Sequence, residues 1–194
     1  MRKIIFDIET RNIFQDVNST DSTALDISVL CLYDSLTDSY SSYLQEDLPK
    51  LWPIIEKADM LITFNGDHFD IPLLNKYYSG DLTKIKSLDL LAEIKKSLGR
   101  RIKLDTIAEA TLGIKKSGNG LEAVTWWKEG KIEKIIKYCL DDVKITKEIY
   151  DYAMTNNKLK YKDIGSNGQI KDIILNTEDW EKKNDNAMTF TLPF

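Results

Sequence analysis

Two carboxylates near the start of the chain have a spacing that suits metal chemistry. Asp7 and Glu9 come directly after the strand-like run 3–6. Residues two apart in a β-strand point to the same face of a sheet, so the two side chains leave the strand side by side. Carboxylates at close range repel, and a bound cation removes that repulsion. Oxygen ligands favour Mg²⁺ or Mn²⁺ over zinc, and two such ions about 4 Å apart are typical of phosphoryl-transfer enzymes.

A third carboxylate, Asp70, follows a turn signal. The apolar run 60–64 leads into Asn65 and Gly66, a pair typical of turns, and Asp70 stands where the next helix is expected to begin. One interpretation is structural, because a carboxylate there gains from the helix dipole and as an N-cap. The other is a ligand of the metal site. His68 is the only histidine, and a lone loop histidine is more often a surface residue than a catalyst.

Helical geometry separates two adjacent acidic residues later in the chain. When residues 132–150 are wound at about 100° per residue, Asp142 falls at the edge of an apolar stripe and Asp141 lies further round among charged neighbours. We therefore expect Asp141 to be solvated and Asp142 to be half-buried. Tyr138 is four residues before Asp142 and shares its flank. The pair is either a Tyr–Asp hydrogen bond or a metal ligand beside a hydroxyl that positions water. The stripe itself consists of Ile132, Ile136, Cys139, Leu140, Val143, Thr146 and Tyr150.

The order of elements begins with strands and continues with helices. Strands are expected at residues 3–7, 27–33, 39–44 and 60–64, with a polar loop at 12–26 and a short element opening at 87. Helices are expected at 48–58, 71–78, 104–112 and 132–154. Residues 159–163 and 169–175 flank a Gly- and Asn-containing turn and predict a β-hairpin, which is too small to fold alone. We expect one domain over 1–155, with the hairpin and tail of 156–194 packed on it.

Composition sets the broad class. The chain has 194 residues, of which 42% are hydrophobic and 30% charged, as expected for a soluble globular protein. No apolar run approaches the about 20 residues that span a bilayer, and Asp7 interrupts the first apolar stretch, so we expect neither a membrane anchor nor a signal peptide but a cytoplasmic protein. Cys31 and Cys139 do not suggest a disulfide framework. The net charge of −4 does not indicate the basic footprint usual for nucleic-acid binding.

Three short motifs together resemble the DnaQ-like 3′–5′ exonucleases in their tyrosine-bearing (DEDDy) branch. The first motif, Asp-x-Glu-Thr, is matched by Asp7, Glu9 and Thr10; the second, an Asn before a Phe-Asp pair, by Asn65, Phe69 and Asp70; the third, Tyr-x-x-x-Asp, by Tyr138 and Asp142. The third motif is similar to that of family B polymerase proofreading domains. The block 64–74 is similar to bacterial stand-alone ribonuclease H-like exonuclease domains. The resemblance covers residues 1–155.

This resemblance implies a fold and a set of roles. The fold would be α/β and ribonuclease H-like, with a mixed central β-sheet flanked by helices and the C-terminal hairpin as an extension. Asp7, Glu9, Asp70 and Asp142 would hold two Mg²⁺ or Mn²⁺ ions, and Tyr138 would orient the attacking water. Thr10, Asn65 and Phe69 would line the pocket for the terminal nucleotide. The expected activity is removal of nucleotides from the 3′ end of single-stranded DNA or RNA.

Two other functions stay open on the same fold. A non-catalytic nucleic-acid-binding module is disfavoured because none of the four carboxylates is missing. An endonuclease of the ribonuclease H or resolvase type does not need the Tyr138–Asp142 pair.

Two further features of the sequence have alternative interpretations. The basic residues at 95–96, 100–101, 103 and 115–116 either grip phosphates or form a solvated helix end. The apolar tail 188–194 is expected to dock on the protein itself or on a partner. Its Leu-x-Phe ending resembles peptides that bind sliding clamps, which would make a clamp or a polymerase the partner.

Overall fold

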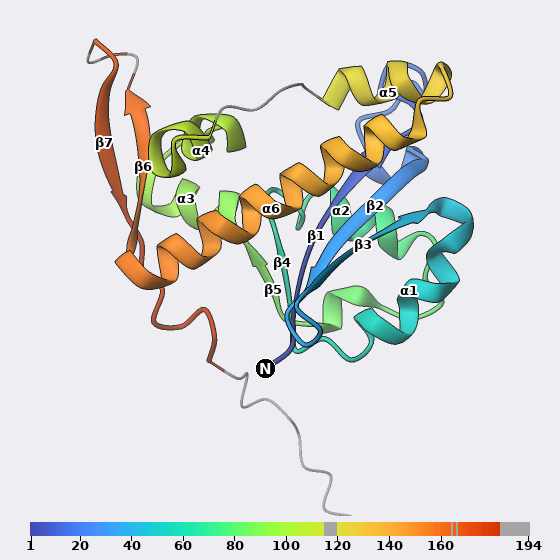
Figure 1. Cartoon of the computed structure of the whole chain (residues 1–194), viewed down its shortest axis with the longest axis horizontal. Helices are drawn as coiled ribbons and strands as arrows, with labels where there is room; N and C mark the ends of the chain where they lie inside the picture. The colour runs from blue at the N-terminus through green and yellow to red at the C-terminus, as the bar shows by residue number, and fades with distance from the viewer. Residues whose placement is uncertain (115–119, 164, 166, 183–194) are drawn as a thin grey trace, which may run out of the picture.

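A mixed five-stranded sheet forms the centre of the molecule, and helices cover both of its faces (Figure 1). The computed structural model describes residues 1–114, 120–163, 165 and 167–182. The strands lie in the order β3-β2-β1-β4-β5. Their bounds are β1 Lys3–Thr10, β2 Ile27–Asp34, β3 Ser39–Leu44, β4 Met60–Thr63 and β5 Ser87–Asp89. β2 is antiparallel to β1 and β3, whereas β4 and β5 run parallel to β1. The predicted α/β fold with a mixed central sheet flanked by helices is confirmed.

The alternation of side chains along β1 divides the core in two. Ile4 and Phe6 belong to the core beneath α1 and α2, whereas Ile5 belongs to the core beneath α3 to α6. Asp7 and Glu9 continue the row of Ile5, so the strand directs both carboxylates toward the α6 side of the sheet. The helices are α1 Leu48–Ile55, α2 Asp70–Asn75, α3 Leu90–Leu98, α4 Leu104–Leu112, α5 Gly120–Lys128 and α6 Ile132–Asn156, with single 3₁₀ turns η1 Ser22–Ala24, η2 Gln45–Asp47 and η3 Leu82–Lys84.

Several predicted bounds differ from those observed. β1 continues past the predicted end at residue 7 to Thr10, because β2 pairs with it along that whole length. α1 ends at Ile55 rather than at residue 58, and α2 is shorter than the predicted 71–78. The short element expected at residue 87 is a strand followed by the full helix α3. α5 has no counterpart in the predicted elements.

The buried face of α6 is rotated from the predicted stripe. Ile132, Ile136 and Leu140 are only partly buried, whereas Ile135 and Ile149 are fully covered. The rotation brings Tyr138 and Asp142 into the buried face, so the prediction that they are half-buried is wrong. The complete buried set is Ile135, Tyr138, Cys139, Asp142, Val143, Ile145, Thr146, Ile149, Tyr150 and Ala153. The neighbouring Asp141 keeps 39% of its side chain exposed and pairs with Lys144 at 3.5 Å.

The predicted C-terminal hairpin is present and packs on the main body. β6 Lys158–Asp163 and β7 Gln169–Ile174 pair antiparallel. Leu159, Tyr161 and Ile173 are buried in the same core as α4 and α6. The chain then returns to the start of β1, where Trp180 stacks on Tyr150 at 6.2 Å between ring centres. The tail 188–194, with its clamp-like ending, lies outside the described residues.

Across the described ranges, no helix combines the length and apolar character that crossing a membrane requires.

Candidate active site

Three acidic side chains from two elements converge on the α6 side of β1. One carboxylate oxygen from each of Asp7, Glu9 and Asp142 lies within 4.8 Å of the other two. Glu9 and Asp142 are buried, and Asp7 is partly exposed. Close to this acidic group β1 and α6 are held together, because the Cys139 thiol of α6 donates a hydrogen bond to the Asp7 carbonyl of β1 at 3.3 Å. Burial raises the pKa of that thiol well above its usual range, which keeps the donor proton in place. Oxygen donors in this arrangement fit a hard divalent cation such as Mg²⁺ or Mn²⁺.

Asp70 reaches the same cleft from the opposite edge of β1. Its Oδ1 accepts the backbone N–H of Ile8 at 3.1 Å. β4 pairs with β1 only as far as Ile5, so Asp70 supplies the acceptor that a longer β4 would have supplied. Asp70 is the first residue of α2 and Phe69 holds the N-cap position, so the N-cap interpretation of Asp70 is wrong. Burial raises the pKa of Asp70 to about 7. Asp70 lines the cleft with the three carboxylates but is not part of their close group.

Tyr138 stands beside the acidic group on α6. Its side chain is buried and packs edge-on against Trp126 of α5, with 5.8 Å between ring centres. It lines a cleft of about 770 Å³ together with the carboxylates. The first residue of α5, Gly120, faces Glu9 across this cleft: a Cβ placed on Gly120 would lie 3.9 Å from Glu9 Oε2. Helix α5 therefore forms one wall of the cleft and also holds the Tyr138 ring.

The three residues predicted to contact substrate all line this cleft. The Thr10 hydroxyl donates to a nearby loop carbonyl at 2.8 Å. Phe69 packs edge-on against Phe14, 6.2 Å away, and is partly exposed. Asn65 has a left-handed backbone with φ 78°, and its Oδ1 accepts a hydrogen bond from Arg101. The structure thus brings every predicted site residue to one cleft, while His68 is exposed and does not line it.

One buried carboxylate that supports the site was missed from the sequence. Asp89 accepts the backbone N–H of Asn65 at 2.8 Å and caps α3 through the N–H of Leu91 at 2.9 Å. It therefore holds the loop that follows β4 in position. The signal was available, since an Asp directly before an apolar helical run predicts an N-cap. Of the predicted basic residues, Lys103 lines this cleft, and Arg101 lines an adjoining pocket that shares Asp7, Tyr138 and Asp142 with it. The predicted pair at 115–116 lies outside the described residues.

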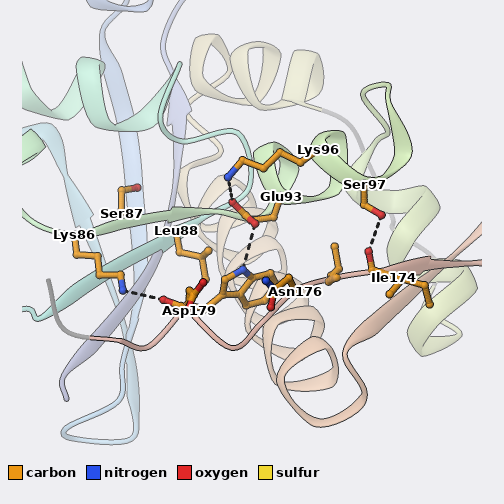
Figure 2. Close-up of a pocket in the computed structure, with 11 residues that line it drawn as sticks. Lys86, Ser87, Leu88, Glu93, Lys96, Ser97, Ile174, Asn176 and Asp179 are labelled. Carbon is orange, nitrogen blue, oxygen red and sulfur yellow. Dashed lines mark hydrogen bonds and ion pairs between the residues drawn. The ribbon is translucent and has the colours of Figure 1, made fainter.

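A separate cavity, of about 570 Å³, lies at the amino-terminal end of β5 and shares no lining residue with the cleft (Figure 2). Its polar groups have partners within the protein: Trp180 Nε1 donates to Glu93 at 3.3 Å, Glu93 also pairs with Lys96, and Lys86 donates to the backbone carbonyl of Asp179 at 3.3 Å. The cavity marks where the segment after β7 is anchored to α3.

The strand order and the acidic group spanning the first strand and the last long helix define an α/β protein of the ribonuclease H type. The family model of the RNase H superfamily matches residues 4–154, and the chain belongs to that superfamily. A similar solved structure is that of the family B DNA polymerase from the hyperthermophilic archaeon Pyrobaculum calidifontis, with 17% sequence identity, a TM-score of 0.62 and 79% of this chain covered. The match spans 24% of the polymerase chain, so it shows a shared fold over that part. No curated protein sequence matches the chain.

Proposed function

We propose that the chain is a 3′–5′ exonuclease that removes nucleotides from the 3′ end of single-stranded DNA or RNA. The observation that carries this proposal is the meeting of three sequence motifs, far apart in the chain, in one cleft. Asp7, Glu9 and Asp142 form its acidic group, and Tyr138 and Asn65 stand beside them. Asp7, Glu9 and Asp142, with Asp70, would hold two divalent cations, Mg²⁺ or Mn²⁺. When bound, such ions make a water molecule more acidic and stabilise the charge on the leaving 3′ oxygen.

Tyr138 is the residue that we assign to orienting the attacking water. Its ring is held by Trp126, so its hydroxyl keeps a fixed position at the cleft wall. A phenol placed in this way donates or accepts a hydrogen bond without taking up charge at neutral pH.

The lining of the cleft supports a single strand as substrate. Phe14, Phe69, Leu121 and Val124 contribute apolar surface close to the carboxylates. An unpaired base gains from contact with aromatic and apolar side chains, whereas a duplex presents mainly its phosphate backbone to a protein. Thr10 and Asn65 add polar groups for the sugar and phosphate of the terminal nucleotide.

The proposal is tested with linear and circular substrates of the same sequence. A 5′-labelled linear strand with Mg²⁺ should give a ladder that shortens from its 3′ end, and the circle should stay intact. Cleavage of the circle would identify an endonuclease, and binding without cleavage under either Mg²⁺ or Mn²⁺ would identify a non-catalytic module. Asp142→Asn should abolish the ladder, and the matched variant Asp141→Asn should retain it.

A further inference from the structure

The hairpin β6–β7 presents a face to solvent that the cleft does not use. Strand alternation turns Leu159 and Tyr161 into the core and therefore directs the intervening residues outward. We call this outward side the hairpin face; it consists of Lys158, Lys160 and Lys162 on β6 and their cross-strand partners Ile174, Asp172 and Ile170 on β7. Ile170 and Ile174 are 62% and 65% exposed, among the most exposed large apolar side chains of the described residues.

The hairpin face carries positive charge in an acidic protein. Residues 158–174 include four lysines and two aspartates, a formal charge of +2, against −4 for the whole chain. On the face itself, Lys158 pairs with Asp172 at 2.7 Å, which leaves the charges of Lys160 and Lys162. Ammonium groups beside exposed apolar side chains match a single nucleic-acid strand, since the former meet phosphates and the latter meet unpaired bases.

Basic residues lie between the cleft and the hairpin. The loop between α3 and α4 contributes Arg101 and Lys103 to the pocket that adjoins the cleft and shares Asp142 with it. The preceding residue, Arg100, lies over the ring of Tyr161, 5.5 Å from its centre, on the inward side of β6 and opposite the hairpin face. One short connection therefore touches the acidic cleft at one end and the hairpin at the other.

The hairpin is held firmly in this position. The Thr111 hydroxyl at the end of α4 bonds both backbone groups of Lys160, at 2.9 and 3.1 Å. The Ser97 hydroxyl of α3 donates to the Ile174 carbonyl at 2.6 Å (Figure 2). Both strands of the hairpin are thus tied to the helices that flank the connection.

From the charge and exposed apolar side chains of the hairpin face and its position beside the α3–α4 connection, we propose that the single strand leading away from the cleft on its 5′ side runs along that connection, passes the edge of the hairpin and lies on the hairpin face. The proposal rests on the proposed function, which places the 3′ end in the cleft. A second copy of the chain is a poorer occupant, because two such faces would bring lysines against lysines. The hairpin also lies beyond the residues 4–154 that match the superfamily, so the path is an addition of this chain to the common fold.

The test compares two double variants of equal charge change. Lys160→Glu with Lys162→Glu alters the hairpin face; Lys50→Glu with Lys57→Glu alters α1 and the turn after it, at the opposite end of the molecule (Figure 1). Binding of fluorescent oligothymidylate is measured by anisotropy in Ca²⁺ or EDTA, so that turnover does not enter. For strands of about 20 nucleotides, the hairpin variant should bind about tenfold more weakly, and the slope of log K against log salt should become shallower by about 1.4. Strands of about four nucleotides should bind all proteins alike.

Each outcome decides between the proposals. Unchanged binding of long strands by the hairpin variant at low salt would overturn the path, as would an equal loss for short and long strands. Normal binding together with a dimer that the hairpin substitutions dissociate would assign the face to a second copy instead. Melting temperatures check that both variants fold. If the chain is inactive but binds long strands through these lysines, the exonuclease proposal is refuted and the binding path stands. If the chain is an active exonuclease whose binding the hairpin substitutions leave unchanged, the exonuclease proposal stands and the binding path is refuted.

Discussion

Replacing Asp142 with asparagine should abolish nuclease activity and yet stabilise the metal-free protein. An oxygen of Asp142 lies within 4.8 Å of oxygens of Asp7 and Glu9. Two unit charges at that separation repel by about 3.5 kcal/mol at an effective dielectric constant of about 20. Asp142 takes part in two such pairs, but proton uptake and small movements relieve most of the repulsion. We therefore expect the substitution to raise the free energy of unfolding of the metal-free protein by about 1–3 kcal/mol. Asparagine keeps the volume of the side chain and its capacity for hydrogen bonds.

The assay is thermal unfolding in EDTA and across a Mg²⁺ titration. For a chain of this length the melting temperature in EDTA should rise by about 2–10 °C in Asp142→Asn. Mg²⁺ should stabilise the wild type more than the variant, because binding to the folded state alone raises stability. Asp141→Asn is the control, since Asp141 is partly exposed and pairs with Lys144, and it should respond to Mg²⁺ as the wild type does. A lower melting temperature for Asp142→Asn in EDTA, or an undiminished response to Mg²⁺, would refute the acidic metal site.

Three further changes test other parts of the structure. Tyr138→Phe removes only the hydroxyl and should lower turnover by about 100-fold with little change in substrate affinity, as single-turnover kinetics would show. Gly66→Ala places a Cβ 2.2 Å from Thr63 Oγ1 and should cost about 1–3 kcal/mol in urea unfolding. Asp34→Asn breaks a bidentate pair with Arg2 and should cost about 1.5–3 kcal/mol at neutral pH. Because Arg2 lowers the pKa of Asp34, that difference should vanish as acid protonates the wild-type carboxylate.

The placements of side chains that follow from local periodicity were predicted correctly. Strand alternation alone places Asp7 and Glu9 on one face, and helical spacing alone places Tyr138 and Asp142 on one flank. Strands β1, β2 and β4 were also predictable locally, because they are short apolar runs, and β3 was predictable as the hairpin partner of β2.

Features that depend on distant partners were not predictable in this way. The buried face of α6 is set by the strands that it covers. A prediction based on apolarity alone therefore placed Ile132 and Ile136 in that face, although both are partly exposed. Helix α5 begins with Gly120 and carries two adjacent tryptophans, a weak helical pattern. Trp126 of α5 is held in place by its packing against Tyr138 of α6, and the local sequence does not reveal that contact.

The contacts of two buried carboxylates explain how a cleft built partly from a loop is held in place. Asp70 accepts an N–H from Ile8, which lies between the two acidic residues of β1. Asp89 accepts an N–H from Asn65 and also caps α3. The segment between β4 and α2 is thus fixed at one end to the cap of α3 and at the other to the strand of the acidic group. Hydrogen bonds to carboxylates are stronger than those between neutral groups, so a shift of this segment would break two of them. The proposed nucleotide pocket at Asn65 and the proposed ligand Asp70 must therefore move, or stay, together.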